Sequence, residues 1–208
     1  MNKYTRPVVK ATLCLALLSS LSGCVALVVG GVAGAAAASV DRRTLGTQAD
    51  DKAIAVKVDM RLPKLTGPDV HINANSFNRV VLLTGEVKDE TMKAAVEREV
   101  RSIDGVVSVA NELTIAGPAT YPARANDSLI TTKVKASLVD MKTISATSIK
   151  VVTERSVVYL MGRVTQREGQ VASDVARGVS GVSKVVKIFD YITEDEMRAL
   201  SPQKGVQL

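Results

Sequence analysis

The chain has 208 residues, a formal net charge of +6, one histidine, two cysteines and no tryptophan. A zinc site needs several clustered ligands, and a Ser-His-Asp triad needs a base beside its nucleophile. The composition therefore favours a protein that is not an enzyme, with no catalytic residues, no cofactor and no metal site. We interpret His71 as an ordinary strand residue, and carboxylates such as Glu97 and Glu99 as surface charges.

Residues 1–23 have the composition of a secretory signal peptide. Three basic residues precede an uncharged apolar stretch from Ala11 to Leu21. The sequence Leu-Ser-Gly-Cys that follows resembles the bacterial lipobox, after which Cys24 becomes the first residue of the mature chain and carries the lipid. The alternative is an uncleaved transmembrane anchor, since no charge occurs between Ala11 and Val40.

Residues 24–48 are predicted to be a lipidated, flexible tether, because they are rich in glycine and alanine and then become polar. Cys14 leaves with the signal peptide and the lipid occupies Cys24, so the mature chain has no disulfide. Valine, not aspartate, follows Cys24. By resemblance to lipoprotein sorting rules, this favours lipid anchoring in the outer membrane, with the protein facing the periplasm.

The rest of the chain contains one unit twice. The octet VVLLTGEV (Val80–Val87) reappears as VVYLMGRV (Val157–Val164), and Asp51–Leu62 aligns with Asp127–Leu138. The segment IDGVVSV likewise aligns with VSGVSKV. We therefore predict two small domains, at residues 49–115 and 126–192, because each copy is longer than a solenoid repeat.

Each copy is predicted to fold in the order α-β-β-α-β. Two alternating strands form a hairpin, and a second helix leads to a closing strand. The fold class is α+β, with a three-stranded mixed sheet packed against two helices in each domain. The buried stripe of the first helix recurs every four positions: Ile54, Val58 and Leu62, then Ile130, Val134 and Leu138.

Six polar or small positions are assigned to the ends of these elements. Asp51 and Asp127 are predicted helix N-caps, and Gly105 and Gly181 are predicted C′ residues. Gly85 and Gly162 are placed where the second strand leaves the sheet.

Two further segments lie outside the domains. Residues 116–125 are predicted to be a short linker stiffened by Pro118 and Pro122. Residues 193–208 are predicted to form a short C-terminal helix, opened by a capping box at Thr193–Glu196, followed by a tail.

The repeated unit resembles the BON domain (bacterial OsmY and nodulation). The V-x-L-x-G-x-V strand end, the second helix and the I/V-x-G-V restart carry this match, and the lipobox with two such domains resembles outer-membrane lipoproteins of this family. The resemblance implies that the second domain binds anionic phospholipids, phosphatidylglycerol or cardiolipin, and that the protein supports outer-membrane integrity. It also implies contact with the β-barrel assembly machinery and enrichment at the division site.

Charge distinguishes the two copies. Asp50–Ile115 holds nine Lys/Arg and eleven Asp/Glu, a net of −2, whereas Asn126–Ile192 holds ten and six, a net of +4. The first helix of the second copy is expected to expose an apolar residue beside two lysines, which suits anionic head groups. The predicted phospholipid-binding residues are Leu129, Thr132, Lys133, Lys135 and Ala136.

Other interpretations remain open. In one alternative, the first helix of the second copy is an ordinary solvated helix whose lysines bind nothing. In another, Leu129 packs against the neighbouring domain. The alternative function is a protein-interaction or chaperone-like envelope adaptor without direct lipid recognition. Nucleic acid is rejected as a partner, because the basic domain lacks interleaved aromatic residues and the chain carries an export signal.

Overall fold

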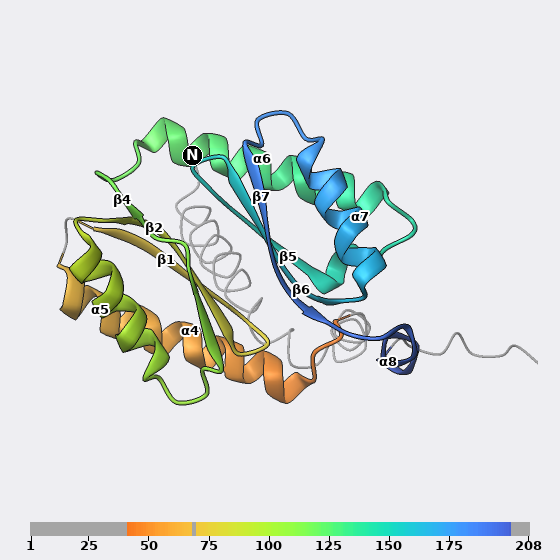
Figure 1. Ribbon diagram of the computed structural model, residues 1–208, viewed down its shortest axis with the longest axis horizontal. Helices are drawn as coiled ribbons and strands as arrows, with labels where there is room; N and C mark the ends of the chain where they lie inside the picture. The colour runs from red at the N-terminus through yellow and green to blue at the C-terminus, as the bar shows by residue number, and fades with distance from the viewer. Residues whose placement is uncertain (1–40, 68–69, 201–208) are drawn as a thin grey trace, which may run out of the picture. The chain divides into compact units, whose positions relative to one another are not determined.

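The computed structural model describes residues 41–67 and 70–200 (Figure 1). The predicted signal peptide, Cys24 and the tether up to residue 40 lie outside the described residues, as does the tail from residue 201. Within the described residues, both copies of the repeat belong to one compact unit.

The first domain follows the predicted order of elements (Figure 1). It consists of α4 (Leu45–Thr66), β1 (His71–Phe77), β2 (Val80–Val87), α5 (Glu90–Arg101), β3 (Ser108–Asn111) and β4 (Thr114–Ile115).

The second domain repeats this order and adds a short helix at its end. It consists of α6 (Tyr121–Asp140), a 3-10 turn η2 (Ala146–Ser148), β5 (Ile149–Glu154), β6 (Val157–Val164), α7 (Gln166–Arg177), β7 (Lys184–Tyr191) and then α8 (Glu194–Leu200).

The two octets are the central strands of the two sheets. β2 pairs antiparallel with β1 and parallel with β3, and β6 pairs in the same way with β5 and β7. The α+β architecture with mixed sheets is therefore confirmed. In the first domain the last strand is interrupted, because Leu113 turns its side chain into the core (2% exposed), so β3 and β4 pair separately with β2.

Each domain has a core between its helices and one face of its sheet. The apolar stripes predicted for the first helices are buried there, which confirms them: Ile54, Val58 and Leu62 in α4, and Ile130, Val134 and Leu138 in α6.

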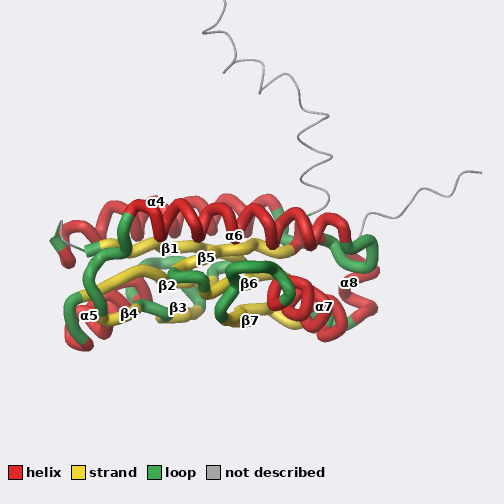
Figure 2. Tube along the Cα trace, turned by 90° about the horizontal axis from the view of Figure 1, so that it is seen from above, coloured by secondary structure: helices red, strands yellow, loops and turns green. Residues whose placement is uncertain are grey.

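The opposite faces of the two sheets share a third core. Phe77 and Leu82 of the first domain pack with Tyr159 and Met161 of the second. Burial raises the pKa of Tyr159 to about 12, and the charges of Glu112 and Glu154 act in the same direction. Figure 2 shows the result: β1 and β5 run along one side of this unit beside α4 and α6, with α5 and α7 along the other.

The prediction that Asp51 and Asp127 are helix N-caps is wrong. Both lie inside helices and are buried, and the N-caps are Thr44 and Thr120, seven residues earlier in each copy. The first helices are therefore one to two turns longer than the repeat alignment indicated. Residues 45–48 of the predicted tether and residues 121–125 of the predicted linker are helical.

The two aspartates instead bind the hairpin turns. Asn78–Arg79 and Arg155–Ser156 have positive φ, as a two-residue turn between twisted antiparallel strands requires. The Arg155 and Ser156 amides each donate to the Asp127 carboxylate at 2.8 Å, and the Asn78 and Arg79 amides bind Asp51 in the same way. Each carboxylate thus couples its helix to a turn about 28 residues away.

Hydrogen bonding also sets the ionisation of Asp51. Burial alone would raise the pKa of this carboxyl, but hydrogen bonds from Ser76, from the turn amides and from Arg43 outweigh burial and lower it. Asp51 is therefore held as a carboxylate.

The two strand glycines are required for close backbone approach. Gly85 lies opposite Ile72, and a Cβ on it would collide with the His71 carbonyl oxygen; a Cβ on Gly162 would lie 2.6 Å from the Ser148 carbonyl oxygen. They therefore lie within paired strands, not where the strand leaves the sheet.

The predicted C′ glycines lie beyond the helix ends. Gly105 and Gly181 have φ of +96° and +97°, but α5 and α7 are capped at Ser102 and Gly178. Their left-handed backbone belongs to the turn that leads into the closing strand.

The segment before α4 is bound to the second domain. Arg42, only 8% exposed, donates to both carboxylate oxygens of Glu168 at 2.6 and 2.8 Å and to the Arg163 carbonyl at 2.9 Å. Burial alone would raise the pKa of Glu168, but the Arg42 bonds and the Thr165 amide lower it overall. Residues 41–48 are thus not part of a flexible tether.

Candidate lipid-facing surface

Helix α6 is positioned by its cap and by one buried face. The Thr120 hydroxyl accepts from the Ala123 amide, and Pro122 occupies the first turn, where it costs no intrahelical hydrogen bond. Burial of Asp127, Ile130, Val134 and Leu138 fixes the rotation of the helix about its axis. The face opposite to these residues is therefore exposed.

The five predicted phospholipid-binding residues all lie on exposed parts of α6. Leu129 is 61% exposed. The other four are also exposed: Thr132, Lys133, Lys135 and Ala136.

The outward face is longer than the sequence analysis indicated. Exposed uncharged residues follow the helical spacing from one end of α6 to the other; they are Tyr121, Ala125, Leu129, Thr132, Ala136 and Val139. We call these six residues the outward stripe. Tyr121, 87% exposed, supplies an aromatic side chain at its start, and it was missed because it lay in the predicted linker.

The two lysines beside the outward stripe are free to bind a ligand. Across residues 41–67 and 70–200, neither Lys133 nor Lys135 has a hydrogen-bonding or ion-pairing side-chain partner. A third lysine, Lys150 on β5, faces the first domain, where its ammonium donates to the Ser76 carbonyl oxygen at 3.3 Å. Burial lowers the pKa of Lys150 and the charges of Arg43 and Lys135 lower it further, whereas the charge of Asp51 opposes them.

An apolar groove continues from the C-terminal half of α6 onto β5. It has a volume of about 230 Å³ and is lined by Lys135, Leu138, Val139, Ala146, Ile149 and Val151. An apolar ligand group entering this groove would lie beside the Lys135 side chain.

Helix α4 provides a comparison, because its outward residues are also uncharged. Leu45, Val56 and Met60 are 70%, 56% and 59% exposed. Its basic residues are more engaged than those of α6: Lys57 donates to the Asp104 carbonyl, and Arg61 pairs with Glu99. The clearer differences are the net charge of the second domain and the apolar groove beside α6.

No helix within residues 41–67 and 70–200 is both long enough and apolar enough to cross a membrane. One group of residues in the same ranges has the donor atoms for a metal ion, namely His71, Glu86 and Glu154. These residues belong to strands and are separate from the outward stripe of α6.

Comparison with known proteins identifies the class. The model of the BON domain matches residues 50–117 and 126–192, so the chain belongs to the BON domain family. These ranges cover both repeats and place their starts and ends close to the predicted boundaries.

Relatives define the type within this family. The chain is 37% identical over 188 residues to the outer membrane lipoprotein DolP of Haemophilus influenzae, which covers 89% of this chain and 97% of that protein. It is 32% identical over 155 residues to the 21 kDa hemolysin of Actinobacillus pleuropneumoniae, a match that covers 74% of this chain and 80% of that protein. It is 49% identical over 61 residues to the osmotically-inducible protein Y of Escherichia coli, which covers 29% of this chain and 30% of that protein. The chain is a DolP-like protein with two BON domains, and the name of that relative supports the predicted lipid-anchored location at the outer membrane.

Proposed function

We propose that this protein is held at the inner leaflet of the outer membrane by lipid on Cys24 and binds anionic phospholipids through α6. The expected ligands are phosphatidylglycerol and cardiolipin, and the expected role is to support outer-membrane integrity. The observation that carries the proposal is the outward stripe of α6 with the unpaired Lys133 and Lys135 beside it. Catalysis has no part in it.

The physical basis is a combination of insertion and charge. Apolar and aromatic side chains of a helix lying in the interface enter the boundary between head groups and acyl chains. Leu129, Val139 and Tyr121 suit this role. Each basic residue near an anionic surface contributes about 1 kcal/mol.

A second candidate function is binding of a protein partner, such as the β-barrel assembly machinery. The exposed Leu45, Val56 and Met60 of α4 favour it, because this apolar row belongs to the net acidic domain. This adaptor hypothesis predicts that lipid binding is weak and insensitive to changes on α6.

The test is flotation with vesicles of varied phosphatidylglycerol content, using protein without residues 1–24 so that acyl chains cannot bind. Lys133→Glu with Lys135→Glu should remove at least ~2 kcal/mol, roughly a thirtyfold loss of affinity. Wild-type binding should also weaken as salt shortens the Debye length. Leu129→Glu should weaken binding with less dependence on salt, because it removes insertion.

Changes on α4 serve as matched controls. Lys52→Glu with Lys64→Glu alters the net charge equally, and Ala53→Glu corresponds to Leu129→Glu in the other copy. Both should bind nearly as well as wild type, with circular dichroism confirming the fold. Equal losses of vesicle affinity in the α4 and α6 variants would mean that only net charge matters. Unchanged vesicle binding by the α6 variants would favour the adaptor hypothesis.

A further inference from the structure

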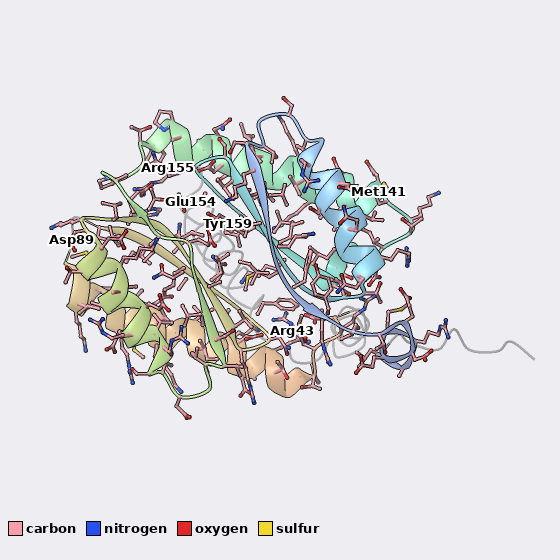
Figure 3. All side chains as sticks on the ribbon, in the orientation of Figure 1. Arg43, Asp89, Met141, Glu154, Arg155 and Tyr159 are labelled. Atoms are coloured by element: carbon pink, nitrogen blue, oxygen red, sulfur yellow. The ribbon has the colours of Figure 1, made fainter. Side chains whose placement is uncertain are left out.

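Three possible metal ligands meet where the two domains contact each other. His71 lies at the start of β1, Glu86 near the end of β2, and Glu154 at the end of β5. One ligand atom from each lies within 4.8 Å of the other two. Asn73 on β1 fixes Glu154 by donating to Oε2 at 3.0 Å. Figure 3 shows Glu154 and Arg155 at the hairpin of the second domain.

Two of the donor atoms are buried without hydrogen-bond partners in the described part of the chain. Glu86 is 1% exposed, and neither its Oε2 nor the Nδ1 of His71 makes a hydrogen bond. The two atoms are 3.4 Å apart. This matches the edge of a tetrahedron around a zinc ion, which is about 3.3 Å for ligand bonds of ~2.0–2.1 Å.

The charge of the cluster also favours a cation. Glu86 and Glu154 are both buried; Arg155 contacts Glu86 Oε1 at 3.2 Å, and Arg124 lines the adjoining cavity. A buried carboxylate oxygen without a hydrogen bond is costly, and a cation bound between Glu86 Oε2 and His71 Nδ1 would remove that cost. An imidazole nitrogen with two carboxylates suits zinc, whereas magnesium and calcium prefer oxygen ligands alone.

We infer that His71, Glu86 and Glu154 bind a divalent transition-metal ion, of which Zn²⁺ fits best, and that this ion links the two BON domains. The fourth position is left to water. A polar cavity of about 150 Å³, lined by His71, Asn73, Arg124, Asp127 and Glu154 among others, gives access from solvent.

The repeat-equivalent positions do not form a second cluster of metal ligands. By strand pairing, His71 corresponds to Ser148, Glu86 to Arg163, and Glu154 to Phe77. Those three residues cannot hold a zinc ion, so one ion per chain is expected.

Zinc titration by calorimetry tests this proposal. Full-length protein in detergent, purified without a histidine tag and stripped with EDTA, should bind one equivalent of ZnCl₂ and show a higher melting temperature with zinc. Magnesium should do neither. Because His71 is the only histidine, its ring ¹⁵N signals report the site directly and should shift on zinc addition.

Variants distinguish zinc binding at this cluster from zinc binding to exposed carboxylates. His71→Ala and Glu154→Gln should each lower zinc affinity at least tenfold and abolish the rise in melting temperature. Glu90→Gln, an exposed charge-matched control on α5, should leave both unchanged. Zinc binding that is absent in wild type, or equal in wild type and His71→Ala, would overturn the proposal.

Discussion

The contact between Arg42 and Glu168 predicts a large stability loss when its arginine is removed. Arg42→Ala leaves a carboxylate that is 3% exposed without its cation. Breaking a buried ion pair by removing one partner costs about 3–5 kcal/mol. This is a large part of the roughly 5–15 kcal/mol expected for the free energy of unfolding of the whole protein.

A double-mutant cycle measured by urea unfolding gives the energy of this pair. Glu168→Gln should cost less than Arg42→Ala, because glutamine still serves in the capping box with Thr165. The double mutant should be more stable than Arg42→Ala alone. As a control, Arg61→Ala breaks the exposed pair with Glu99 and should cost at most about 1 kcal/mol.

The pH dependence provides an independent check. The pKa of Glu168 is lower in the folded protein than in the unfolded chain, so its stabilising contribution is present above the unfolded pKa. That contribution disappears as the pH falls through the folded pKa. The difference between wild type and Arg42→Ala should therefore shrink in acid. A loss below 1 kcal/mol at pH 7, or a difference that grows in acid, would refute the reasoning.

Three further predictions concern strand packing, turn stability and lipid attachment. Gly85→Val should lower the melting temperature more than Gly162→Val, since Gly85 also has a positive φ of +114°; equal effects would contradict the role of backbone strain. Asp127→Asn should lower the free energy of unfolding by about 1–3 kcal/mol, because it weakens two hydrogen bonds from the hairpin amides. An unchanged urea midpoint would show that Asp127 does not stabilise the turn. Cys24→Ser should yield an unprocessed or soluble product in membrane fractionation, and insensitivity of the wild type to globomycin would favour a transmembrane anchor.

The order and type of the elements could be predicted because they depend on local periodicity. The stripes of α4 and α6 and the two octets each carry their signal within a dozen residues. The predicted caps were wrong for a related reason. Asp51 and Asp127 occur at the same place in both repeats, and the repeat alignment began there. Nothing near them in sequence indicates hairpin turns about 28 residues away.

Contacts between the two repeats could not be predicted. Glu86 and Glu154 are in different copies, and only the packing of the two sheets brings them together. One signal for this packing was available: β2 is an almost continuous apolar run, which is typical of a strand covered on both faces. The outward stripe of α6 was found only in part, because assigning residues 116–125 to a linker removed Tyr121 and Ala125 from the helix.

The Arg42 contact affects how the two proposed membrane attachments act together. Residues 25–41 span at most ~60 Å when fully extended, so a lipid on Cys24 and the second domain cannot be separated by more than about this distance. Once the lipid is inserted, binding by α6 becomes intramolecular, with a high effective concentration of head groups. A weak affinity of the outward stripe is then sufficient for permanent contact. The charge-reversal variants should accordingly lose binding in the form without residues 1–24, yet remain in the membrane fraction when lipidated.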